Sequence, residues 1–192
     1  HDVIAFLTNV AENVGEDSRF IHKGVTSSDI IDTAFSLQLK QSCKIIKTEL
    51  KDLINNLKLK SLEFKNLPCI GRSHGIFAEH TTFGLKMLAK FCEFERHYKR
   101  LINAEKQISI CTISGAVGTY ANINPYVEKY VAKKLNLSVE DVPTQIIPRD
   151  RHAYLFSTLA LIASSIENLA TEIRHLHRSE VGEVEEFFSK DQ

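Results

Sequence analysis

The chain alternates between long helical patterns and short polar islands. Apolar residues recur with a helical period over residues 29–67, and no glycine or proline interrupts them before Pro68. The pattern predicts one helix of about 35 to 40 residues, far above the norm of ~12 for globular helices. Similar patterns predict further helices over residues 2–14, 82–107, 125–135 and 151–178. Because such long helices need partners along their whole length, we expect an all-α, long-helix bundle that associates with other copies of itself.

The most unusual stretch, GRSHGIFAEHTTFG at residues 71–84, lies between two of these long helices. Each of its glycines lowers helix stability by roughly 1 kcal/mol relative to alanine, so the backbone there needs close approach or an unusual angle. Its polar side chains are Arg72, Ser73, His74, Glu79, His80, Thr81 and Thr82. We interpret the stretch as part of a functional site, the alternative being a polar connection whose threonines cap the next helix.

Other polar islands precede the predicted helices. Gly24 is followed by Thr26, Ser27 and Ser28; one hydroxyl suffices as a helix cap, which leaves the others and the open amides free to bind an oxyanion. His1 and Asp2 stand at the start of the first helix. There they could hold a phosphate or carboxylate, although capping alone is the simpler interpretation.

Two more islands lie in the second half of the chain. Residues 111–124 carry two glycines among small side chains, which indicates either a tightly packed connection or a backbone close to a ligand. Residues 142–152 contain two prolines, Gln145 and a charged cluster in which Asp150 is expected to cap the third long helix. Phe91 and Phe94 are interpreted as core residues, and the apolar middle of the third long helix predicts burial on several sides.

The composition indicates which kinds of partner and which cellular setting suit the protein. The 24 Lys and Arg residues balance 24 Asp and Glu residues, which gives no indication of nucleic acid or a membrane surface as partner. Four scattered cysteines lack metal-site spacing and indicate a reduced, cytoplasmic setting. No apolar run approaches the ~20 residues of a membrane span. The chain begins at His1 and ends soon after the patterned residues 183–188. We expect a central helical region, 1–192, cut from a longer protein, with a first part at 1–67 and a second at 68–192.

The islands together resemble a known family. They are HDV at 1–3, IHKGVTSSDIIDTA at 21–34, GRSHGIFAEHTTFGLK at 71–86, SGAVGTYANI at 114–123 and TQIIPRDRHA at 144–153. In this order they resemble the adenylosuccinate lyases of the fumarase/aspartase superfamily across essentially the whole chain. The resemblance implies long helices that form the central bundle of a homotetramer, with active sites shared between three subunits. It implies no metal and no organic cofactor.

The activity implied is β-elimination of fumarate from small-molecule substrates in purine nucleotide biosynthesis. Adenylosuccinate would give AMP, and SAICAR would give AICAR. Such an elimination requires a base beside a carboxylate, stabilisation of the resulting aci-carboxylate and an acid for the leaving nitrogen. An imidazole, with an ordinary pKa of ~6.5, suits the acid role near neutral pH.

The resemblance assigns roles by position. His74 matches the general acid, and the expected substrate-binding residues are His1, Asp2, His22, Thr26, Ser27, Ser73 and Gln145. The other histidines are expected to be structural or solvated. Ser73 stands where the family usually has threonine, Lys23 replaces a common tyrosine and His80 a common proline. The family's flexible loop with the catalytic base serine is expected just past Gln192, so the fragment alone is expected to be inactive.

Two alternatives stay open. The chain could be a catalytically silent helical oligomerisation module, although such modules need apolar stripes and short loops rather than five glycine-rich polar islands. It could also be a sister lyase of the superfamily, such as argininosuccinate lyase, or a cycloisomerase. SGAVGTYANI and TQIIPRDRH disfavour this second alternative because they resemble the purine enzyme.

Overall fold

The computed structural model describes residues 2–189. Over this range the elements in chain order are α1 (Asp2–Val14), a 3-10 helix η1 (Gly15–Phe20), α2 (Ser27–Glu63), β1 (Pro68–Ser73), β2 (Ile76–Thr82), α3 (Phe83–Ile108), β3 (Ile110–Cys111), α4 (Pro125–Leu135), β4 (Ser138–Val139) and α5 (Arg149–Leu176). The all-α fold is confirmed, and every predicted helix is present. The largest difference in a boundary is at the end of α2, which stops at Glu63 instead of residue 67.

The chain divides into two compact units. Unit 1 contains His1–Ile45 and Asn103–Leu155, and unit 2 contains Ile46–Ile102 and Phe156–Gln192. The helices α2, α3 and α5 each contribute a stretch to both units, and each unit is described separately below.

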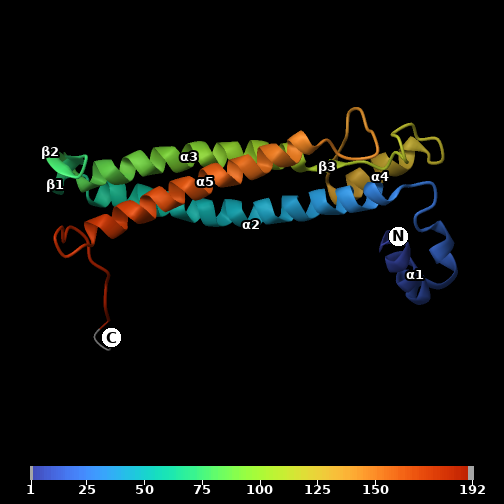
Figure 1. Ribbon diagram of the computed structural model, residues 1–192, viewed down its shortest axis with the longest axis horizontal. Coiled ribbons are helices and arrows are strands. Elements are labelled where there is room, and N and C mark those ends of the chain that lie inside the picture. Colours follow the sequence, from blue (N-terminus) through green and yellow to red (C-terminus); the bar gives the residue numbers. More distant parts are fainter. Residues whose placement is uncertain (1, 190–192) are drawn as a thin grey trace. The chain divides into compact units, whose positions relative to one another are not determined.

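In unit 2 the stretches of α2, α3 and α5 run side by side (Figure 1). Each contributes buried apolar side chains from one face, and they are Leu50, Ile54, Leu57, Met87, Phe94, Leu101, Ile162, Leu169 and Leu176. Burying a side chain of this size stabilises the fold by about 1.5 to 3 kcal/mol. The core role of Phe94 is confirmed, whereas Phe91 is half-buried.

Polar side chains also join α3 to α5 in unit 2. Lys86 Nζ donates to Glu172 Oε1 at 2.7 Å, and Lys90 Nζ donates to Asn168 Oδ1. The ring of His97, only 4% exposed, has its Nε2 at 2.8 Å from Ser165 Oγ. Because buried polar groups need partners, these contacts favour one register of α3 against α5.

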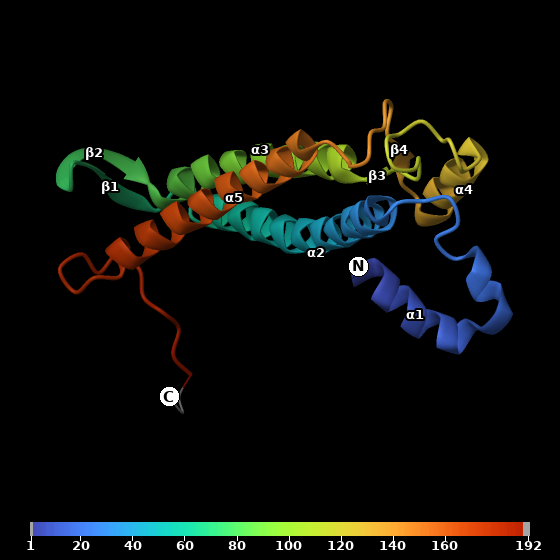
Figure 2. The ribbon, with the colours of Figure 1, turned by 45° about the vertical axis from the view of Figure 1, so that its right-hand side comes forward.

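Unit 2 also contains a β-hairpin that the sequence analysis did not predict. Residues 71–82, which the sequence placed in an irregular stretch between two helices, belong to the antiparallel strands β1 and β2 and the turn between them (Figure 2). His74 and Gly75 form the tip with φ of +54° and +77°, the two positive angles that a type I′ hairpin turn requires. The register shifts between Ile70 and Arg72, so that Ala78 and Glu79 of β2 form a bulge opposite the single residue Gly71 of β1. An added Cβ at Gly71 would lie 2.9 Å from the Glu79 carbonyl oxygen.

Unit 1 is built from the first turns of α2, the short helix α4 and the parallel pair of β3 and β4. Its core holds Cys111, Ile113, Ala132 and Leu137. The predicted start of α4 is confirmed. Asn124 caps it by accepting the N–H of Tyr126, and Pro125 occupies the first turn, where the missing proline N–H has no cost.

The buried face of the first turns of α2 is the polar one. The side chains buried there are Asp29, Asp32, Thr33 and Ser36, whereas the exposed ones include Ile30, Ile31 and Phe35. On α1, Ile4 and Phe6 are 61% and 64% exposed. A groove of about 450 Å³ runs between the two helices and is lined by Val3, Phe6, Ile30, Ile31, Ala34, Phe35 and Gln38. These apolar residues therefore lie outside the core of unit 1.

Helix α5 differs from expectation in two ways. It begins at Arg149, so Asp150 lies inside the first turn instead of capping it. Its apolar middle is also largely exposed in this chain, with Phe156, Leu161, Ile166 and Ile173 each 46 to 52% exposed. By length and composition α5 is the one helix among residues 2–189 that could cross a membrane, a test that core helices of soluble proteins also pass.

Candidate functional site

Asp29 organises the start of α2 in unit 1. Its carboxylate is fully buried and accepts three backbone N–H groups. Oδ2 accepts those of Thr26 at 2.9 Å and Gly115 at 3.0 Å, and Oδ1 accepts that of Ser114 at 3.1 Å. Asp29 thus stands at the third position of the helix and bonds back to the residue before it, as in a capping box. It also fixes the loop 111–124 against the helix start.

The two glycine-bearing loops of unit 1 pack backbone against backbone. An added Cβ at Gly24 would lie 2.1 Å from the Asn122 carbonyl oxygen, and one at Gly118 would lie 2.2 Å from that of Pro143. Both glycines have φ near +77°, an angle that other residues rarely adopt. The tightly packed connection considered for residues 111–124 is therefore correct at Gly118.

The segment that carries Gln145 is held at two points. Before it, the carbonyl of Thr144 accepts a hydrogen bond from Ser114 Oγ at 3.3 Å. After it, Asp32 Oδ2 accepts the N–H of Ile147 at 2.9 Å and a guanidinium N–H of Arg149 at 2.8 Å. Gln145 itself is exposed. The segment thus presents the Gln145 amide from a fixed backbone.

Three of the five predicted islands therefore meet in unit 1. Thr26 and Ser27 are half-buried at the start of α2, and neither hydroxyl has a hydrogen-bond partner within residues 2–189. The expected hydroxyl cap is replaced by Asp29. The hydroxyls and the open amides of the first turn are consequently available to an anion, which the positive end of the helix dipole favours.

His22 is half-buried in the turn that precedes α2, with φ of +64°. Its Nε2 atom is enclosed, and no residue from 2 to 189 partners it. A buried ring nitrogen normally has a hydrogen-bond partner. The Nε2 atom of His22 is therefore available to bind a ligand.

Ser73 and His74 belong to unit 2, where the hairpin exposes both side chains. His74 lies with Gly75 in the two-residue turn at the hairpin tip, where its φ is positive. Of the remaining predicted residues, His1 lies outside the described range, and so does the side chain of Asp2, whose backbone begins α1.

Sequence reasoning missed the buried acids that hold these loops. Besides Asp29 and Asp32, Glu128 is 1% exposed and accepts the N–H of Ile113 at 2.8 Å and the hydroxyl of Tyr120 at 2.7 Å. Burial and the bond to Glu128 raise the pKa of Tyr120 to about 12. The i, i+3, i+4 spacing of Asp29, Asp32 and Thr33 is a signal that could have revealed a polar helix face.

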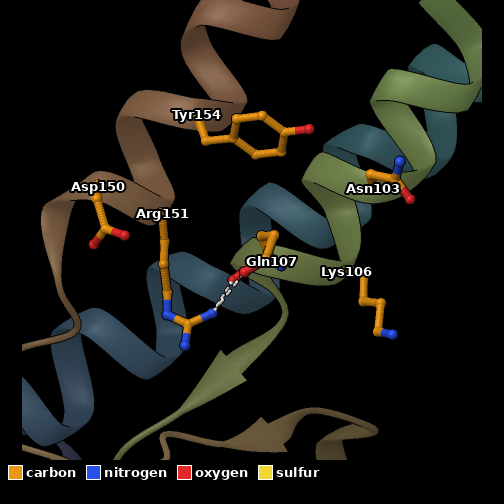
Figure 3. A pocket seen from close by; sticks show the side chains of 6 residues that line it. All are labelled: Asn103, Lys106, Gln107, Asp150, Arg151 and Tyr154. Carbon is orange, nitrogen blue, oxygen red and sulfur yellow. Dashed lines mark hydrogen bonds between the residues drawn. The ribbon is translucent and has the colours of Figure 1, made fainter.

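A polar cleft of about 600 Å³ in unit 1 contains none of the predicted site residues. It is lined by Asn103, Lys106, Gln107, Asp150, Arg151 and Tyr154 (Figure 3). Arg151 donates to the carbonyl and the side-chain oxygen of Gln107, and also pairs with Glu140. Since this guanidinium is already satisfied, the cleft offers less to an anionic ligand than its composition suggests.

The arrangement suits binding of carboxylates by hydroxyls, amides and imidazoles. All four cysteines are free. Within residues 2–189 no group of three or more His, Cys, Asp or Glu side chains is placed to hold a metal ion.

Comparison with known proteins identifies the family. The lyase family matches residues 1–192. The chain is 50% identical to the adenylosuccinate lyase of Thermotoga maritima and 49% identical to that of Bacillus subtilis, over 100% of this chain and 44% of each relative. The chain thus spans less than half the length of these curated relatives.

Solved structures agree with this result. The crystal structure of a fumarate lyase from Mesorhizobium sp. BNC1 matches with a TM-score of 0.88 at 29% identity, over 94% of this chain and 43% of that chain. The 3-carboxy-cis,cis-muconate lactonizing enzyme from Pseudomonas putida matches with a TM-score of 0.86 at 29% identity, over 94% and 41%. The resemblance of the polar islands is confirmed, and the chain belongs to the lyase family of the fumarase/aspartase superfamily.

Proposed function

We propose that the full-length protein is an adenylosuccinate lyase, which eliminates fumarate from adenylosuccinate to give AMP and from SAICAR to give AICAR. The observation that carries this proposal is the identity of about 50% to curated adenylosuccinate lyases along all 192 residues. The geometry supports it, because the first turn of α2 offers unpaired hydroxyls and amides to the carboxylates of a succinyl group.

In this proposal His74 protonates the leaving nitrogen. Its exposed position at the hairpin tip leaves the imidazole free to meet a substrate. Thr26, Ser27 and Ser73 hold carboxylates of the succinyl group, and Gln145 binds the substrate from its anchored segment. His22 faces the phosphate side, while His1 and Asp2 contact the nucleotide. No metal or organic cofactor takes part.

The proposed assembly is a cytoplasmic homotetramer whose active sites combine residues of three subunits. The exposed apolar side chains of α1, α2 and α5 support an assembly through helix faces. Light scattering on the full-length protein tests the assembly, and a stable folded monomer would contradict it.

The reaction is tested by following fumarate release from adenylosuccinate by the full-length protein, with argininosuccinate as the comparison substrate. We expect turnover of adenylosuccinate only, inhibited by AMP and unaffected by arginine. Turnover of argininosuccinate alone would instead assign the sister lyase. Absence of any lyase activity in a folded tetramer would favour the silent oligomerisation module.

A further inference from the structure

Arg72 belongs to the hairpin that carries His74 and has no role in the function proposed above. It lies two residues before His74 on β1, opposite Phe77 of β2. Its guanidinium carbon is 5.2 Å from the centre of the Phe77 ring, and its Nη2 donates to Glu183 Oε1 at 2.5 Å. One side chain therefore joins both strands of the hairpin to the segment after α5.

The other partner of this ion pair is fixed to the end of α5. The N–H of Glu183 donates to the carbonyl of Leu176 at 3.0 Å, and that of Val184 does so at 3.4 Å. The ring Nδ1 of His177 lies 3.0 Å from the Val184 carbonyl oxygen. Since Leu176 is buried in unit 2, Glu183 offers Arg72 a fixed anchor.

The hairpin needs such an anchor. An isolated two-stranded hairpin is marginally stable in water, and residues 76–80 of β2 are exposed. The base of the hairpin is tied by the N–H of Phe83 to the Leu67 carbonyl at 3.0 Å. Nearer the tip, the ion pair of Arg72 and Glu183 joins the hairpin to the rest of unit 2 within the described residues. The two side chains are 21% and 22% exposed.

We propose that Arg72 and Glu183 are positioning residues, whose ion pair holds the His74 turn in its productive place against the end of α5. The proposal rests on the proposed function, in which His74 is the general acid. Arg72 Nη1 and Glu183 Oε2 are both enclosed without a partner in residues 2–189. Removal of either side chain therefore leaves an enclosed charge uncompensated and releases the hairpin.

The test uses the full-length enzyme with Arg72→Met and Glu183→Gln, separately and together. Misplacing a catalytic group by about 1 Å costs up to about 100-fold in rate. We expect kcat to fall at least about tenfold. KM should rise by a smaller factor, through Ser73 on the same hairpin, because the other described substrate-binding groups lie in unit 1 and stay in place. The double variant should be no slower than the slower single variant, since the two residues act as a unit.

The matched control is the ion pair of Lys86 and Glu172, which joins α3 to α5 at 2.7 Å without including a hairpin residue. Lys86→Met and Glu172→Gln should leave kcat within about twofold of the parent enzyme, even if they lower the melting temperature equally. A kcat within twofold for both Arg72→Met and Glu183→Gln would overturn the proposal.

A second readout separates this proposal from the proposed function. Amide hydrogen exchange in residues 68–82 should rise in Arg72→Met and stay unchanged in Lys86→Met. Unchanged exchange in Arg72→Met overturns the positioning role whatever the activity. A parent enzyme that cleaves no adenylosuccinate overturns the proposed function, while the exchange result still decides whether the pair holds the hairpin.

Discussion

Asp29 Oδ2 accepts the backbone N–H of Gly115 at 3.0 Å, across 86 positions of sequence. The same carboxylate holds the N–H groups of Thr26 and Ser114. Two loops with predicted ligand-binding residues are thus fixed by one buried acid. We infer that the order of this part of unit 1 depends on Asp29 more than on any of the exposed residues around it.

Asp29→Asn tests this dependence. The amide keeps the size of the side chain but replaces one accepting oxygen with a donor, which leaves buried N–H groups unsatisfied. We expect the free energy of unfolding of the full-length protein to fall by about 1 to 3 kcal/mol, measured by urea denaturation. Asp52→Asn, an exposed position on the same helix, provides the control and should change it by less than about 0.5 kcal/mol. Equal effects of the two substitutions would argue against the role of Asp29.

Arg149→Gln tests the anchoring of Gln145. Arg149 donates to both oxygens of Asp32, at 2.8 and 3.1 Å, and the substitution removes this paired contact while the Ile147 N–H remains. Because the segment bearing Gln145 loses one anchor, we expect KM for adenylosuccinate to rise about three- to tenfold, with little change in kcat. Arg96→Gln is the control, since among residues 2–189 the Arg96 guanidinium donates to the Cys92 carbonyl of its own helix. A KM unchanged by Arg149→Gln would contradict the anchoring.

The helices could be predicted from sequence because their signals are local. The apolar period of 3.6 extends through α2, and Pro125 marks the first turn of α4. The same period does not identify the core of the single chain, since Ile31 and Phe35 recur at helical spacing and yet are exposed. A single chain's pattern shows which residues share a face, but it does not show whether that face packs within the chain or against another copy.

The hairpin and the buried acids could not be predicted from the local sequence pattern. His74-Gly75 between Ser73 and Ile76 is a two-residue turn of the type that hairpins favour, but the bulge in β2 opposite Gly71 breaks the alternation that would have marked the strands. Of the three hydrogen bonds that Asp29 accepts, only the one from the Thr26 N–H joins residues that are close in sequence. Its other partners, Ser114 and Gly115, are brought to it by the fold.

The buried His97 predicts a pH dependence of stability. Burial lowers its pKa, and the nearby Arg100 and Arg96 lower it further, against the opposing effect of Glu93. Between this lowered pKa and the ordinary ~6.5, the unfolded chain binds more protons than the folded one. Stability is therefore full above about pH 6.5 and falls as the pH drops through this window.

His97→Gln should flatten this dependence, because glutamine can still bond to Ser165 but does not titrate. The slope of the unfolding free energy against pH, measured from pH 7 to 5, should decrease by at most about 1.4 kcal/mol per pH unit. His80→Gln, exposed on β2, should leave the slope as it is. A slope that His97→Gln does not change would contradict the assignment to His97.

His74→Ala in the full-length enzyme tests the proposed acid directly. The side chain is exposed at the hairpin tip, so its removal should leave folding and the assembly measured by light scattering intact. Loss of a general acid alone costs about 100- to 10,000-fold in rate, so fumarate release should fall by at least the lower figure. His80→Ala, on the same hairpin, should retain turnover within about threefold of the parent enzyme. Near-parental turnover by His74→Ala would remove His74 from the catalytic role and leave the hairpin with a structural one.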